Sequence, residues 1–216
     1  CVQFELAFVN AIPVISLVTF LIGIVIAYLS AEQIRKYGGN IFIVDGVALA
    51  MGRELSPLIV ATVVAGRSGS AFTAQIGSMK LTQEIDVIEV MGLRVFDVVV
   101  LPRVIALVLA MPLLVLIGDI VGLFGGMLVA DILLDITPMT FLERLRSSVE
   151  IRHFISGIIK APFFALFIAL IACRMGLAVK SSARSVGIGT TSTVVQSIVT
   201  VILLDALFAV IYMELG

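Results

Sequence analysis

Long runs of apolar residues are the feature that most constrains what this chain of 216 residues can fold into. A helix that crosses a membrane needs about 20 mainly apolar residues, each rising about 1.5 Å. Five segments meet this requirement: residues 8–29, 41–65, 98–129, 155–177 and 193–213. Hydrophobic residues make up 61% of the chain and charged residues 13%, against about 45–50% and about 25% in soluble domains. The sequence therefore predicts an all-α integral membrane protein with about five transmembrane helices, folded as one domain over residues 1–216.

The segment 67–93 between the second and third spans has a different character. It is neither apolar enough to span a membrane nor polar enough to be disordered. Leu81, Ile85 and Ile88 recur at helical spacing, and the residues between them include acidic side chains. This pattern predicts an amphipathic helix that packs on one side and offers the other to water or to a partner.

Two other connections are polar. Residues 131–153 contain Pro138 and several charges at helical spacing, which predicts an excursion outside the membrane with a surface helix. Residues 180–191 are rich in serine, glycine and threonine, which predicts a loop. Within the third span, Gly118, Gly122 and Gly126 are four residues apart, a spacing that lets helices approach closely within a subunit or between subunits.

Catalytic, metal and nucleotide motifs are missing from the sequence. Gly187 and Gly189 begin like a phosphate-binding loop, but no strand precedes them and no Gly-Lys-Ser/Thr follows. His153 is the only histidine, so a zinc site is not expected, and the net charge of −1 provides no basic field for nucleic acid. We therefore expect a chain that is not an enzyme and that binds no metal or cofactor itself.

Charged residues inside the apolar spans are the strongest sign of function. They are Arg53, Glu54, Asp119, Lys160 and Asp205. A charge at the centre of a bilayer costs at least ~2.5–3.5 kcal/mol on insertion scales, so such residues face a bundle interior or a wet cavity. They are interpreted either as structural ion pairs or as part of a transport pathway, and the sequence leaves both open.

Arg53 and Glu54 have a particular backbone setting. Adjacent residues on an α-helix project about 100° apart, so each is expected to take its partner from another element, with Lys160 as one candidate. Pro57 has no N–H, and the carbonyl of Arg53 therefore loses its helical donor and becomes free for another contact.

Four motifs in this order resemble the MlaE (YrbE) permease family. They are residues 53–57 (RELSP), 65–71 (AGRSGSA), 77–80 (GSMK) and 82–92 (TQEIDVIEVMG). The resemblance continues through Pro102-Arg103 and Leu204-Asp205, so it covers nearly the whole chain. The family often has Glu where Gln75 stands, and Glu-Gln where Gln83-Glu84 stands.

The resemblance implies a function and a set of partners. It implies a homodimeric permease of the bacterial inner membrane that pairs with a separate ABC ATPase, which binds ATP and Mg²⁺, and with an MCE-domain substrate-binding protein. It implies ATP-driven movement of phospholipid or similar hydrophobic molecules between the inner membrane and the outer envelope. Residues 67–93 would then be a cytoplasmic coupling segment, and residues 131–153 would lie in the periplasm.

The resemblance also implies site residues. The expected lipid pathway, with two intramembrane charges added to the family positions, comprises Ile26, Ile34, Tyr37, Arg53, Glu54, Leu55, Lys160 and Asp205. The expected contacts with the ATPase are Arg67, Gly69, Gln75, Gly77, Glu84, Asp86 and Glu89. Two alternatives stay open: a self-sufficient secondary transporter or channel that uses the buried charges as an ion relay, and a scaffold that anchors other subunits.

Overall fold

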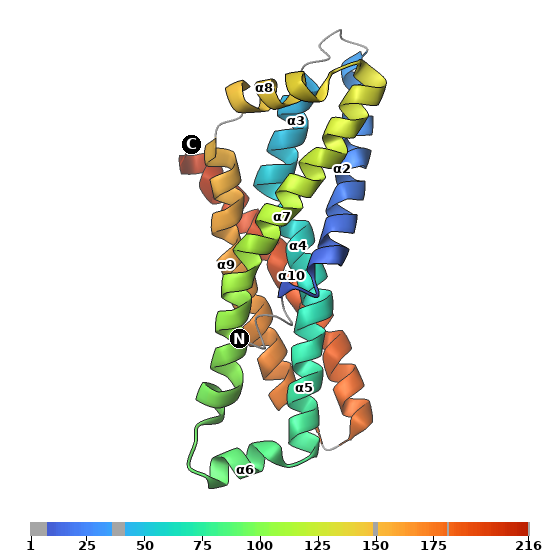
Figure 1. The fold of residues 1–216 in the computed structure, drawn as a ribbon. Coiled ribbons are helices and arrows are strands. Elements are labelled where there is room, and N and C mark those ends of the chain that lie inside the picture. The colour runs from blue at the N-terminus through green and yellow to red at the C-terminus, as the bar shows by residue number, and fades with distance from the viewer. Residues whose placement is uncertain (1–7, 36–41, 149–150, 181, 216) are drawn as a thin grey trace. The chain divides into compact units, whose positions relative to one another are not determined.

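A computed structural model describes residues 8–35, 42–148, 151–180 and 182–215 (Figure 1). The described residues form helices and connections without a strand. In chain order the helices are α2 (Ile12–Arg35), α3 (Phe42–Leu49), η1 (Ala50–Leu55), α4 (Ser56–Val64), η2 (Ala65–Gly69), α5 (Ser70–Leu81), α6 (Glu84–Val90), η3 (Phe96–Val100), α7 (Leu101–Leu134), α8 (Pro138–Ser148), α9 (Ile151–Leu177) and α10 (Ala183–Leu215). The segments η1, η2 and η3 are π-helical.

Among the described residues, five helical stretches are long and apolar enough to cross a membrane, as the sequence predicts. They are Ile12–Gln33, Phe42–Leu81, Phe96–Leu134, Phe154–Leu177 and Ala183–Tyr212. The protein is therefore an all-α, multi-pass membrane protein.

Two connections differ from the sequence expectation. The helix of the second span does not end near residue 65, because η2 and α5 continue it without a break to Leu81. Within 67–93, the separate amphipathic helix is only α6. Residues 183–191 are the first turns of α10 and not a loop. The Thr190 hydroxyl donates to the Gly187 carbonyl at 2.7 Å, so a polar side chain is satisfied within the helix and needs no loop to reach a partner.

The chain divides into two compact units, each described here by itself. Unit 1 comprises Cys1–Ala11, Ala61–Pro112 and Ala161–Gly216, and unit 2 comprises Ile12–Val60 and Leu113–Lys160. Both units therefore contain parts of α4, α7 and α9.

The core of unit 2 forms where α2, α3, α7 and α8 contribute buried side chains to one apolar cluster, including Ala27, Val47 and Phe141. A Cβ atom on Gly23 of α2 would collide with the backbone carbonyl of Gly122 on α7. The glycines spaced by four on α7 thus serve close packing inside this chain. An ion pair also joins α8 to α3, because Arg144 Nη2 donates to Asp45 at 2.7 Å.

Unit 1 is organised around α5, α6 and α10. The Thr73 hydroxyl lies 2.8 Å from the Thr193 hydroxyl and donates to the Ala172 carbonyl at 3.0 Å, which joins α5 to α10 and α9. A second apolar cluster contains Ile76 of α5 together with Ile85 and Ile88 of α6. Figure 1 shows α6 as a short helix between the end of α5 and the segment that leads into α7.

Candidate functional site

The candidate site of unit 2 begins with a change of helical winding. The π-helical segment η1 ends at Leu55, and the N–H of Ser56 donates to the carbonyl of Met51, five residues back. Pro57 follows and has no N–H to offer to the carbonyl of Arg53. That carbonyl instead accepts a hydrogen bond from Lys160 Nζ of α9 at 3.3 Å. The backbone group that the sequence predicts to be free is therefore used to bind a lysine from another helix.

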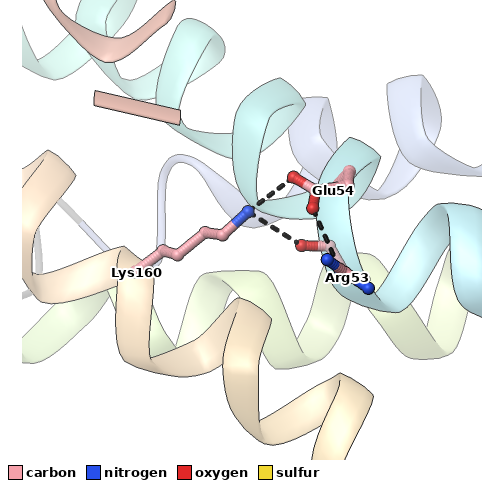
Figure 2. A network of polar contacts seen from close by, with 3 residues as sticks. All are labelled: Arg53, Glu54 and Lys160. Atoms are coloured by element: carbon pink, nitrogen blue, oxygen red, sulfur yellow. Dashed lines mark hydrogen bonds and ion pairs between the residues drawn. The ribbon is translucent and has the colours of Figure 1, made fainter. Parts of the chain in front are cut away.

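Three charged side chains meet at this point (Figure 2). Lys160 Nζ lies 2.5 Å from Glu54 Oε2. Arg53 Nε donates to Glu54 Oε1 at 3.2 Å. The carboxylate of Glu54 thus bridges two cations, and the cluster of Arg53, Glu54 and Lys160 carries one excess positive charge.

The three side chains differ in exposure. The Lys160 side chain is fully buried, whereas the side chains of Arg53 and Glu54 are 35% and 33% exposed. In the described part of the chain, the only side-chain hydrogen bond of Arg53 uses Nε, so its two terminal nitrogens stay available. A guanidinium is weakly hydrated and matches the geometry of phosphate and carboxylate oxygens. The cluster can therefore receive an anionic group on Arg53, while Lys160 positions Glu54 from behind.

One expectation about Arg53 is wrong. Adjacent side chains on an α-helix diverge by about 100°, and Arg53 was expected to find its partner on another element. The structure pairs it with its neighbour Glu54. The winding of η1 closes each turn over more residues than an α-helix, so successive side chains diverge less, and two long side chains can meet.

Of the other predicted pathway residues, Ile26 and Leu55 lie in unit 2 with this cluster, whereas Asp205 lies in unit 1. Ile26 and Leu55 are half-buried and pack against the apolar core of unit 2. Ile34 is part of α2, but its side chain is outside the described part of the structure, and so is the whole of Tyr37. Asp205 is half-buried on α10 in unit 1.

The predicted coupling residues all belong to unit 1, and they fall into two groups. Glu84, Asp86 and Glu89 are exposed on α6, as are Val87 and Val90, while Ile85 and Ile88 are buried and anchor the helix. The exposed part of this short, anchored helix therefore carries three carboxylates together with apolar side chains.

The remaining coupling residues lie on the continuous second span. Arg67 is exposed, whereas Gly69 and Gly77 are buried. A Cβ atom on Gly77 would lie 3.2 Å from a methyl group of Val186, so this glycine permits close packing of α5 on α10. Gln75 is half-buried, and its Oε1 has no hydrogen-bond partner in the described structure. Gly69 and Gly77 are thus packing residues, and only Arg67 and α6 are exposed enough for a partner to bind.

Arg103 is a buried charge that the sequence patterns do not single out. It is 7% exposed on α7, and its Nη1 donates to the Val99 carbonyl at 2.6 Å. The sequence feature that could have identified Arg103 is its position within the apolar run 98–129. The ion pair between Asp45 and Arg144 was also missed, because nothing in the local sequence links residues 99 positions apart.

The fold and the site together define a class: a multi-pass helical membrane protein with a buried, charged cluster inside its spans. Comparison with known proteins then gives the family. The sequence model described as Permease MlaE matches residues 1–211, and the chain belongs to this family of ABC transporter permeases.

Relatives come from bacteria and a chloroplast. A probable ABC transporter permease protein of Rickettsia bellii is 34% identical over 94% of this chain and 79% of its own length. One from Synechocystis is 34% identical over 83% of this chain and 68% of its own length. The chloroplastic protein TRIGALACTOSYLDIACYLGLYCEROL 1 of Arabidopsis thaliana is 33% identical over 94% of this chain and 58% of its own length.

Proposed function

We propose that this chain is the membrane-spanning subunit of an ATP-driven transporter that moves phospholipids or similar amphipathic lipids between the inner membrane and the outer envelope of a bacterium. Two observations about relatives support a lipid substrate. The family is one of ABC transporter permeases, and a chloroplastic relative carries the name of a galactosylated glycerolipid.

The observation that carries the proposal is the arrangement of Arg53. Its guanidinium is one-third exposed, keeps its terminal nitrogens available and is steadied by a carboxylate that a buried lysine holds. A lipid with an anionic head and apolar tails needs one cationic contact within otherwise apolar walls. In this proposal Arg53 contacts the phosphate, Ile26 and Leu55 border the acyl chains, and Lys160 is a positioning residue that never touches the lipid.

The energy for transport is proposed to come from a separate ATPase bound at α6. The sequence holds no nucleotide-binding loop, and α6 offers three exposed carboxylates on a helix fastened by two buried isoleucines. A cationic groove on the ATPase would complement this face. Arg67 is a further candidate contact.

The working unit is proposed to be a homodimer that delivers lipid to an MCE-domain protein outside the membrane. Five spans are few to enclose a lipid with two acyl chains, whereas two copies around an axis provide twice as many helices. The host membrane in this proposal is the bacterial inner membrane.

The proposal is tested by substituting Arg53 in vesicles that contain the permease, its ATPase and fluorescent phospholipid. We expect Arg53→Gln to reduce ATP-dependent transport at least about tenfold, because losing a charge-assisted contact of about 1.5–3 kcal/mol weakens binding of the headgroup. The matched control is Arg146→Gln, which removes an exposed arginine from α8 and should leave transport unchanged.

Two results would contradict the proposal. Normal ATP-dependent transport by Arg53→Gln would remove Arg53 from the pathway. Transport that runs on an ion gradient without the ATPase would instead favour a secondary transporter that uses the buried charges as a relay.

A further inference from the structure

Asp119 is a buried acidic group of unit 2, and the contacts given for the cluster around Arg53 do not include it. It lies on α7, inside the candidate span Phe96–Leu134, and is 4% exposed. Both of its carboxyl oxygens are shielded from solvent, and neither has a hydrogen-bond partner among the described residues. A carboxyl group in this setting needs an explanation, because buried polar groups are almost always satisfied.

The neighbouring hydroxyl groups donate to backbone carbonyls. Ser56 of α4 is the polar side chain beside Asp119, but its hydroxyl donates to the Val115 carbonyl at 3.3 Å. On the α2 side, the Thr19 hydroxyl donates to the Ile15 carbonyl at 2.8 Å. A hydroxyl group has one hydrogen. The hydroxyls of Ser56 and Thr19 both donate their hydrogen to a backbone carbonyl, so toward Asp119 each can act only as an acceptor.

The described helices that pack on this part of α7 contain few charged residues. Between Ile12 and Ala31, α2 contains no charged residue, and α4 contains none at all. The charged residues of η1 are Arg53 and Glu54, which pair with each other and with Lys160. The only charged residue of α3, Asp45, is paired with Arg144 of α8.

The packing is close on the turn of α7 that carries Asp119. A Cβ atom on the adjacent Gly118 would lie 2.8 Å from Ser56 Oγ and 3.3 Å from a methyl group of Thr19. The helices α2 and α4 therefore press on this turn of α7. An ionised carboxylate enclosed here without a cation or a donor would pay its full desolvation cost.

We propose that Asp119 is a proton-binding site inside the membrane, where one proton keeps the side chain a neutral carboxylic acid. The acid hydrogen is donated to Ser56 Oγ, whose own hydrogen is donated to the Val115 carbonyl. This chain of hydrogen bonds gives the hydrogens of Asp119 and Ser56 an acceptor each and leaves no charge on Asp119. The bound proton stabilises the close packing of α2, α4 and α7, and it is released only when that packing opens.

The direct test is infrared spectroscopy of the full chain in lipid vesicles, which separates the carbonyl stretch of a protonated carboxyl from that of a carboxylate. We expect a protonated band at about pH 7, a pH at which an aspartate side chain in water is ionised. The band should be absent from Asp119→Asn, which copies the shape of the neutral acid. It should persist in the control Asp135→Asn, which alters an exposed residue.

Two further measurements keep the proposal falsifiable if Asp119→Asn folds poorly. Ser56→Ala should shift the band to higher frequency, because the acid loses its acceptor, and an unshifted band would overturn the role of Ser56. Adding Na⁺ should leave the band unchanged. Loss of the band on adding Na⁺ would identify a cation site, and a wild-type protein without the band would show a carboxylate, so either result overturns the proton site.

Discussion

At the scale of the residue, Pro57 shapes the candidate site through the backbone carbonyl of Arg53, four positions earlier in the chain. Pro57 withholds a helical donor, and the local sequence is sufficient to predict that. The donor that replaces it, Lys160, is 107 residues away in the chain. Since Lys160 is fully buried and Glu54 is one-third exposed, the two members of this ion pair depend on each other unequally.

Removing either charge should therefore have unequal effects on stability. We expect Glu54→Gln to lower the free energy of unfolding by about 3 kcal/mol, because it leaves a buried ammonium without its carboxylate. Lys160→Met should cost roughly 1 kcal/mol or less, because Glu54 keeps Arg53 and some contact with solvent. Unfolding in mixed micelles with increasing denaturing detergent measures both. Equal losses would show that Glu54 is as dependent on the pair as Lys160 is.

At the scale of the element, glycines that face the backbone of a neighbouring helix allow the helices of unit 2 to pack closely. The spacing of Gly118, Gly122 and Gly126 predicts close approach, but the partner helix is visible only in the structure, where Gly23 of α2 meets Gly122. Gly46 of α3 is a useful contrast, because a Cβ atom there would meet nothing within 4 Å.

Alanine at these two glycines should give opposite results. We expect Gly23→Ala to destabilise the protein by about 2 kcal/mol, because the new methyl group meets a backbone carbonyl that cannot rotate away. Gly46→Ala should be neutral or stabilising by up to about 1 kcal/mol, because alanine is the better helix former. Thermal unfolding followed by circular dichroism distinguishes them. A tolerated Gly23→Ala would mean that α2 and α7 can separate at little cost.

The helix α6 gives another prediction at the scale of the element, because its exposed carboxylates are the proposed contact with the ATPase. We expect a triple charge reversal, with Lys at Glu84, Asp86 and Glu89, to weaken binding of the ATPase at least about tenfold while the helix stays anchored by Ile85 and Ile88. Copurification of the ATPase at several salt concentrations measures this. Glu143→Lys, an exposed reversal on α8, is the control and should have no effect. Unchanged binding of the triple variant would remove α6 from the interface.

At the scale of the whole molecule, the order of the spans sets which connections share a side of the membrane. A single crossing, Phe96–Leu134, separates α6 from α8. A five-span topology therefore predicts that the two helices emerge on opposite faces of the bilayer, and in the proposed function α6 is cytoplasmic and α8 periplasmic.

Side-specific labelling tests this arrangement. Single cysteines that replace Asp86 of α6 and Met139 of α8, both exposed, should react with a membrane-impermeant maleimide from opposite sides of intact spheroplasts and inverted vesicles. Cys1 should be replaced by serine beforehand, and the buried Cys173 serves as the internal control that stays unlabelled. Labelling of both positions from one side would contradict the five-span topology.

The sequence alone determined the class of fold, the number of candidate spans and several of the intramembrane charges, because bilayer thickness and the cost of burying charge act on any chain, whatever its tertiary contacts. It also determined that α6 has a buried side and an exposed side, since helical periodicity is local. The tertiary structure decided which charges meet, that the helix of the second span continues to Leu81 and that residues 183–191 are helical. These depend on contacts between residues far apart in the chain, such as Lys160 with Arg53, or on packing that rewards a helix where glycine, serine and threonine alone favour a loop.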